Sequence, residues 1–334
     1  MTAKRNIIPV FVPHLGCPND CVFCNQRKIS GSLVPATAET VASAVKEGIR
    51  KIPPNTNTQL AFYGGSFTAI PVSEQNELLN AALPFLRDGS ISSLRLSTRP
   101  DAIDTQTLAR LKSFGVRTIE LGAQSMCNEV LKASGRGHTA EQTERASHLV
   151  KEEGFELILQ MMTGLPQDTK KRTEETAERI ISLRPDGVRI YPTVIVKDTP
   201  LFEMWRSGVY KEHTVEEAAD WCALIVPMFE AAGIPVIRLG LNPTEELSRG
   251  AAAGGAYHPA LGELVRSHIL LDRARELIKN TAHGENLVIG VNRADISAMI
   301  GQHRANIDAL CREFSLKSLK VRQADVKKGS LILM

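Results

Sequence analysis

The chain has 334 residues, 43% of them hydrophobic and 23% charged, a balance that excludes a disordered tail or a collagen-like fibre. No apolar run approaches the roughly 20 residues of a membrane helix and no signal peptide is visible, so we expect a cytoplasmic protein with no membrane contact. The 40 basic and 37 acidic residues leave a net charge of +3, and all of that surplus lies in residues 285–334, which hold 8 basic and 5 acidic residues. Six cysteines are too few for a disulfide scaffold, so clustered ones should serve a metal or catalysis.

Short apolar runs alternate with longer amphipathic stretches through most of the chain. The predicted strands are Asn6–Val12, Thr58–Tyr63, Ser93–Ser97, Arg117–Leu121, Glu156–Met161, Gly187–Tyr191 and Pro235–Leu239. The helices predicted between them are Ala38–Ile49, Glu74–Leu86, Thr105–Phe114, Ala140–Glu152, Lys170–Leu183 and Val215–Ala232. Glycine follows several of these helices, as it does at many helix ends.

Strand–helix units that recur at this spacing predict an α/β fold with parallel strands buried on both faces. A complete or partial (β/α) barrel of the TIM type is the expected architecture. A doubly wound open sheet is the alternative, although no G-x-G-x-x-G follows the first strand.

The pattern changes after residue 241, which gives three expected parts: a barrel over 1–241, a connection over 242–284 and a small α+β unit over 285–334. Pro243–His258 is rich in Gly and Ala and is expected to be a loop, and Leu261–Lys279 is expected to be helical. The small unit should comprise strand Leu287–Val291, helices Arg293–Ile300 and Ala305–Glu313, and strands Leu319–Arg322 and Ser330–Leu333.

A cluster of three cysteines follows the first predicted strand. Cys17, Cys21 and Cys24 form C-x3-C-x2-C, and no fourth cysteine lies nearby. Three thiolates can hold a 4Fe–4S cluster and leave one iron open to the amino and carboxylate groups of S-adenosylmethionine (SAM). One electron from such a cluster would cleave the sulfonium and give a 5′-deoxyadenosyl radical. A zinc knuckle with His14 as the fourth ligand is the alternative.

These motifs resemble the radical SAM enzymes, in the branch that contains the Elongator catalytic subunit and oxygen-independent coproporphyrinogen oxidase. The resemblance covers residues 5–240 and starts from the three cysteines and Phe23. It implies a 4Fe–4S cluster on Cys17, Cys21 and Cys24, SAM as second cofactor, and a one-electron reductant of the flavodoxin or ferredoxin type as partner.

Other motifs fall at the carboxyl ends of the strands, where a barrel places its active site. The resemblance implies that these residues line the SAM site; they are Phe23, Gly64, Gly65, Ser66, Arg99, Glu120, Gln124, Arg136 and Gln160. Ser66 and Gln160 stand where the family often has acidic residues. A turn before a helix is the alternative role for Arg99, and a basic loop ahead of a helix is the alternative for Arg136.

Two further residues are candidates for catalysis. Tyr191 follows the sixth strand, where it could hold substrate or carry an electron or hydrogen, or simply pack. His258 follows a Gly-rich segment that is a candidate lid, and it is a candidate general base.

The tail contains Ile300-Gly301-Gln302-His303-Arg304-Ala305-Asn306-Ile307, which resembles the I-G-x-x-G-x-x-I of KH domains. Such a loop clamps single-stranded nucleotides, and Arg304, His303 and Lys317 could meet phosphates. Arg304 replaces the second glycine. A purely structural appendix is the alternative.

The sequence therefore predicts a radical SAM enzyme that modifies RNA, tRNA in the first place. The chain leaves no room for the Elongator family's separate acetyltransferase domain, so acetyl-CoA-dependent chemistry is not expected. Two alternatives remain: radical chemistry on a small molecule or tetrapyrrole-like substrate, and a non-catalytic zinc-containing RNA-binding protein.

Overall fold

A computed structural model of the chain describes residues 5–12, 21–25, 36–53, 56–242, 247–281 and 284–334. The chain divides into two compact units. Residues 1–214 and 228–257 form the first unit, and residues 215–227 and 258–334 form the second. None of the helices in the described residues is both long and apolar enough to cross a bilayer.

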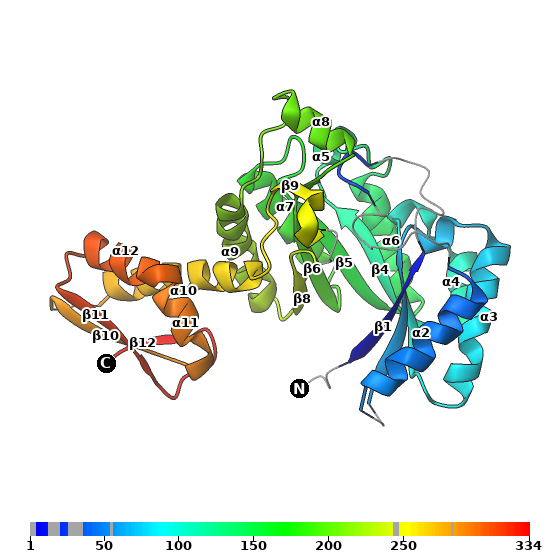
Figure 1. The fold of residues 1–334 in the computed structure, drawn as a ribbon, viewed down its shortest axis with the longest axis horizontal. Coiled ribbons are helices and arrows are strands. Elements are labelled where there is room, and N and C mark those ends of the chain that lie inside the picture. Colours follow the sequence, from blue (N-terminus) through cyan, green and yellow to red (C-terminus); the bar gives the residue numbers. More distant parts are fainter. Residues whose placement is uncertain (1–4, 13–20, 26–35, 54–55, 243–246, 282–283) are drawn as a thin grey trace. The chain divides into compact units, whose positions relative to one another are not determined.

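The first unit is built on a curled sheet of seven parallel strands (Figure 1). In sheet order they are β1 (Asn6–Val12), β2 (Thr58–Gly64), β3 (Ser93–Thr98), β4 (Val116–Gln124), β5 (Glu156–Thr163), β6 (Gly187–Pro192) and β8 (Val236–Leu239). This order follows the chain without the reversal that a doubly wound sheet requires. Among the residues that the structure describes no pairing joins β1 to β8, so the sheet is open between these two strands. The fold is therefore a partial (β/α) barrel, as the sequence predicted.

Helices connect these strands. In the first unit they are α2 (Ala38–Lys51), α3 (Val72–Arg87), α4 (Thr105–Ser113), α5 (Asn128–Ala133), α6 (Ala140–Glu152), α7 (Lys170–Ser182) and α8 (Pro200–Arg206). The helix α9 (Val215–Ala231) precedes β8 and belongs up to residue 227 to the second unit. Thr37 and Thr139 each begin a helix with a capping box, in which side chains satisfy the first free amides. Gly115 and Gly154 end helices at positive φ of 84° and 79°. The short helices α5 and α8 were not predicted.

The two faces of the curled sheet differ in chemistry. On β4, Ile119 and Leu121 are fully buried with apolar neighbours, whereas Thr118 and Glu120 alternate with them and are buried among polar side chains. A strand points successive side chains to opposite faces, so one face packs on helices and the other forms a polar interior. The strands are buried on both faces, as the sequence predicted. The polar character of the interior face was not predicted.

The Gly- and Ala-rich segment after β8 is not a simple loop, and here the prediction was wrong. Within it, β9 (Ala252–Gly255) pairs antiparallel with β7 (Val194–Val196) in a separate two-stranded sheet. Gly255 has φ of 80°, and a Cβ there would lie 2.6 Å from the carbonyl oxygen of Thr193. Glycine therefore allows this close pairing, where the sequence suggested only a loop.

The second unit has a three-stranded sheet covered by helices. It comprises α10 (Leu261–Lys279), β10 (Asn286–Val291), α11 (Ile296–Ile300), α12 (Ala305–Glu313), β11 (Ser318–Gln323) and β12 (Leu331–Leu333). The central strand β10 pairs parallel with β11 and antiparallel with β12. The core of the unit includes Leu270, Ala274 and Ile278 of α10 together with Ile289 of the sheet.

Candidate active site at the carboxyl ends of the strands

The described part of the cysteine loop, residues 21–25, is anchored on two neighbouring segments. Cys21 is buried and Cys24 is partly buried, while Cys17 and His14 lie outside the described residues. The amide of Val22 donates to the carbonyl of Ser134 over 3.1 Å, and the carbonyl of Val22 accepts from the amide of Leu201 over 2.8 Å. These bonds fix the loop between the turn after α5 and the start of α8.

Phe23 lies in the apolar cluster that supports this loop. Val22 and Phe23 are partly buried against a group that includes Ile195, Leu201 and Tyr210. Phe23 therefore holds the cysteine loop on α8, which is compatible with its predicted place beside a cofactor.

Arg136 reaches the cysteine loop from the turn before α6. Its side chain is buried, Nη1 lies 3.4 Å from the Sγ of Cys21, and Nη2 donates to the carbonyl of Gly122 over 2.7 Å. Its Nε is buried and has no hydrogen-bond partner among the described residues. The guanidinium therefore gives the sulfur of Cys21 a charged hydrogen-bond donor, and Cys21 is one of the three thiols expected to bind iron.

Gly122 and Gln124 end β4 beside Arg136. A Cβ on Gly122 would lie 2.8 Å from Nε2 of Gln124 and 3.2 Å from Nη2 of Arg136. Gln124 has a φ of 62°, and the register between β4 and β5 shifts at this point. A bulge of this kind redirects a side chain at the end of a strand, and here it brings Gln124 towards Arg136.

The glycine turn after β2 lies close to the end of β1. Gly64 has φ of 109°, and the amide of Gly65 donates to the carbonyl of Val12 over 2.8 Å. Ser66 is buried, and its hydroxyl lies 2.9 Å from that of Thr98 at the end of β3. This turn is therefore hydrogen-bonded to Val12, the last described residue before Cys21.

Arg99 makes a bidentate ion pair with Asp101, both contacts measuring 2.9 Å. Its Nη2 also donates to the backbone carbonyl of Arg136 over 2.6 Å. Arg99 thus fixes the turn that carries Arg136, and the structure shows it bound to protein groups.

Glu120 lies at the centre of the polar interior. Its Oε1 accepts hydrogen bonds from Arg95 at 2.7 Å, Tyr63 at 2.8 Å and Arg189 at 3.1 Å. Its Oε2 lies 2.8 Å from Nε of Arg189 and accepts from Gln160 at 2.9 Å. Burial alone would raise the pKa of Glu120, but Arg189 and Arg95 outweigh burial and hold that pKa below its ordinary value. The carboxylate is fully buried and charged, and its oxygens are already occupied by protein donors.

This arrangement fixes the orientation of Gln160. A carboxylate only accepts hydrogen bonds, so the amide nitrogen of Gln160 faces Glu120 and its carbonyl oxygen points the other way. Gln160 can therefore offer an acceptor oxygen in place of the carboxylate that is typical of the family.

Arg95, Arg189 and Tyr63 belong to the same network and were missed from the sequence. Burial raises the pKa of Tyr63, and the Glu120 carboxylate raises it further, so the phenol stays protonated. Each of the three lies within a predicted strand, and the two arginines are flanked there by apolar residues. A charged residue inside a buried strand is itself a signal, because burial demands a partner.

The two predicted catalytic residues lie in different units. Tyr191 is the last residue but one of β6, near Arg189, and burial raises the pKa of its phenol. His258 belongs to the second unit, where its Nδ1 accepts from the amide of Ala260 over 3.1 Å in the turn before α10. The contacts of His258 place it at a helix start.

His138 is buried beside the same turn as Arg136. Its Nε2 lies 3.2 Å from the carbonyl of Ala123, and its Nδ1 has no hydrogen-bond partner among the described residues. Burial and the nearby Arg136 lower its pKa to about 4. His138 is therefore neutral at physiological pH.

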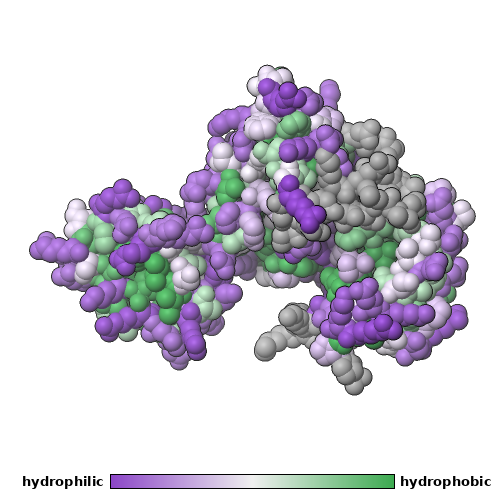
Figure 2. Space-filling model, in the orientation of Figure 1, coloured by the Kyte–Doolittle hydropathy of each residue, from purple (hydrophilic) through white to green (hydrophobic). Residues whose placement is uncertain are grey.

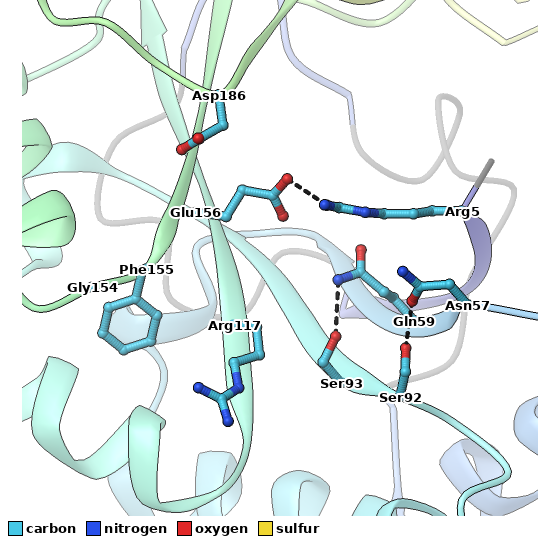
Figure 3. Close-up of a pocket in the computed structure, with 10 residues that line it drawn as sticks. All are labelled: Arg5, Asn57, Gln59, Ser92, Ser93, Arg117, Gly154, Phe155, Glu156 and Asp186. Atoms are coloured by element: carbon cyan, nitrogen blue, oxygen red, sulfur yellow. Dashed lines mark hydrogen bonds and ion pairs between the residues drawn. The ribbon is translucent and has the colours of Figure 1, made fainter. Parts of the chain in front are cut away.

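A polar cavity of about 600 Å³ opens at the opposite, amino ends of the strands (Figure 3). Its side chains bind one another: Arg5 pairs with Glu156, and Gln59 donates to Ser93 over 2.9 Å. Enzymes with this fold have their active sites at the carboxyl ends of the strands. This cavity is therefore not the candidate active site.

Comparison with known proteins agrees with this geometry. The model of the radical SAM superfamily matches residues 11–180, and that of the radical SAM C-terminal domain matches residues 185–270. A tRNA uridine(34) acetyltransferase of Methanocaldococcus jannaschii is 29% identical over 50% of this chain and 35% of its own length. Human Elongator complex protein 3 is 31% identical over 40% of this chain and 25% of its own. The chain thus spans a quarter to about a third of these relatives.

Two solved structures share the fold. The archaeal Elp3 of Methanocaldococcus infernus has a TM-score of 0.64 at 21% identity, covering 80% of this chain and 63% of that one. Coproporphyrinogen III oxidase (HemN) of Escherichia coli has a TM-score of 0.50 at 18% identity, covering 69% and 53%. The chain belongs to the radical SAM superfamily and is an enzyme similar to Elongator complex protein 3 and HemN.

Proposed function

We propose that this enzyme binds a 4Fe–4S cluster through Cys17, Cys21 and Cys24, cleaves SAM reductively and modifies RNA. The superfamily implies both cofactors. When bound, the cluster supplies one electron to the sulfonium of SAM, which yields methionine and a 5′-deoxyadenosyl radical. A one-electron reductant of the flavodoxin or ferredoxin type would return that electron.

The observation that carries the proposal is the position of Arg136. Its guanidinium lies between the sulfur of Cys21 and the carbonyl of Gly122, with a buried Nε that has no hydrogen-bond partner among the described residues. An unsatisfied buried donor costs about 1–3 kcal/mol, so an acceptor at this point would stabilise the site. The methionine carboxylate of SAM is an acceptor of the right charge. The buried donor of Arg136 therefore fits SAM, and the thiols of Cys21 and Cys24 are of the kind that holds an iron–sulfur cluster.

The chain's own residues divide the remaining work. Gly64 and Gly65 allow the backbone to approach a ligand, and Gln124 and the carbonyl of Gln160 offer hydrogen bonds to polar groups of SAM. Glu120 contacts protein groups and acts as a positioning residue for Gln160 and Arg189. This changes the role expected for Glu120 from the resemblance.

RNA as the substrate class rests on the relatives named above and on the charge of the tail. One of those relatives is called a tRNA uridine(34) acetyltransferase. The acetyl transfer in that name is not proposed here, because the match covers 35% of that protein. The zinc-containing, non-catalytic alternative is not retained, since the family match identifies an enzyme.

The loop expected to bind RNA has an unusual backbone. Gly301, His303 and Arg304 have φ of 77°, 50° and 67°, and both side chains are exposed. Arg304 thus takes the left-handed backbone that glycine adopts without strain. Lys317, which was also expected to meet phosphates, forms an ion pair with Glu285.

The experiment is anaerobic turnover with SAM, dithionite and bulk tRNA, compared with the same reaction without tRNA. We expect tRNA to increase 5′-deoxyadenosine formation and to gain mass. Formation of 5′-deoxyadenosine at the same rate with and without tRNA, with tRNA unmodified, would contradict the RNA substrate and leave SAM cleavage standing.

A further inference from the structure

The sheet of the second unit has one face that its helices do not cover. Residues 287, 289 and 291 of β10 point into the core with α10, α11 and α12. Side chains alternate along a strand, so the intervening residues face the other way. By register these are Asn286, Val288 and Gly290 of β10, Ser318, Lys320 and Arg322 of β11, and Ile332 and Met334 at β12. We call this set the open face.

The centre of the open face is apolar and exposed. A Cβ on Gly290 would lie 2.9 Å from side-chain atoms of Ala324, Ile332 and Met334, so these three converge over Gly290. Ile332 is nevertheless 40% exposed and Met334 65% exposed. Figure 2 shows hydrophobic residues ringed by hydrophilic ones on the visible side of this unit. Large exposed apolar side chains that gather in one place mark an interaction surface.

Every ionisable side chain among these register positions is a cation. Lys320 lies beside Val288, and Arg322 lies beside Gly290. Alternate residues on a strand are roughly 6.6 Å apart, so the two charges form a short row along the edge strand. Both side chains are exposed, and neither has a hydrogen bond or an ion pair to any described residue.

We propose that the open face docks a single-stranded segment of RNA. The phosphates would meet Lys320 and Arg322, and a base or ribose would lie on Ile332 and Met334. Unstacked bases of RNA loops stack on aromatic side chains and guanidinium planes while their phosphates contact cations, and an extruded base can also pack against apolar side chains. This proposal rests on the RNA substrate proposed above and places its contact on the sheet, away from the loop over residues 301–304.

A second copy of the chain fits this face less well. Two open faces packed together would place four cationic side chains against each other with no acidic side chain among the facing register positions. Like charges that face each other across an interface cost several kcal/mol. An anionic polymer supplies the missing negative charge.

The test is the affinity of the full chain for a fluorescent anticodon stem–loop RNA, measured over a series of salt concentrations. The double variant Lys320→Ala/Arg322→Ala removes two cations. The matched control, Lys46→Ala/Arg50→Ala, removes an exposed lysine and arginine from α2 of the first unit. Circular dichroism of each variant checks that it folds, and Arg322→Lys tests rescue by charge alone.

We expect the double variant to bind about tenfold more weakly near physiological salt. Its slope of log affinity against log salt should fall by about 1.4, which corresponds to two lost phosphate contacts on a single strand. Ile332→Ser should weaken binding and leave that slope unchanged, and the control pair should bind like the wild type.

Three results would overturn the proposal. If the wild type binds RNA and the double variant binds it equally well, the open face is not the contact, while the RNA substrate stands. If the wild type binds no RNA, both proposals fail. If sedimentation shows a dimer that Ile332→Ser dissociates while RNA affinity is unchanged, the open face binds a second copy.

Discussion

The substitution Glu120→Gln tests whether the buried network holds the barrel together. It keeps the size of the side chain and removes its charge, which leaves Arg95 and Arg189 without their shared carboxylate. The side chains of Glu120, Arg95 and Arg189 are 0%, 3% and 11% exposed, so solvent cannot replace the lost charge. Removing one partner of a buried ion pair typically costs about 3–5 kcal/mol. We expect a loss of that size in the free energy of unfolding of the first unit.

The assay is urea unfolding followed by the fluorescence of Trp205, which lies in α8 of the first unit. Trp221→Phe is placed in every protein compared, because Trp221 belongs to the second unit and would report on it. The control is Glu47→Gln, an exposed carboxylate that pairs with Lys51 on α2. This control should unfold at the same urea concentration as the parent. A Glu120→Gln transition that coincides with the control would refute the role given to the network.

Three further substitutions test the site. In Gly122→Ala the new Cβ would lie 2.8 Å from Nε2 of Gln124 and 3.2 Å from Nη2 of Arg136 and displace both side chains, so isothermal titration should show weaker SAM binding. The control Gly262→Ala, whose Cβ would contact nothing within 4 Å, should bind SAM like the wild type. Arg136→Lys keeps the charge but has one nitrogen and cannot contact both Cys21 and Gly122; we expect weaker SAM binding with the thermal midpoint retained, and unchanged affinity would contradict the assigned contact. His138 has a folded pKa of about 4 against 6.5, so the unfolded chain binds more protons between these values and stability falls as pH falls from 6.5. His138→Asn should lose less stability over this range, and equal loss in both proteins would contradict the buried neutral imidazole.

The positions of most strands and helices could be predicted because local signals specify them. Apolar runs set the strands, and glycine marked helix ends where the backbone needs positive φ, as at Gly115 and Gly154. The helix over 261–279 was predicted at the residues where it occurs. The segment over 252–255 was missed because small residues look like a loop, although here they allow close pairing of strands.

The candidate site was predictable only where a motif carried it. Cys21, Gly64 and Arg136 stand in motifs that can be read from one stretch of chain. The partners of Glu120 are 25 and 69 residues away, and strand register alone brings them together. The sequence therefore suggested that Glu120 binds a ligand, while its neighbours in space show that it binds two arginines.

Anaerobic reconstitution with iron and sulfide, followed by addition of SAM and dithionite, tests the central claim most directly. We expect the wild type to bind a 4Fe–4S cluster and release 5′-deoxyadenosine, and Cys24→Ser to lose both, with Cys311→Ser as the cysteine control that retains both. A wild type that binds iron poorly, or a Cys24→Ser variant that still forms 5′-deoxyadenosine, would contradict it.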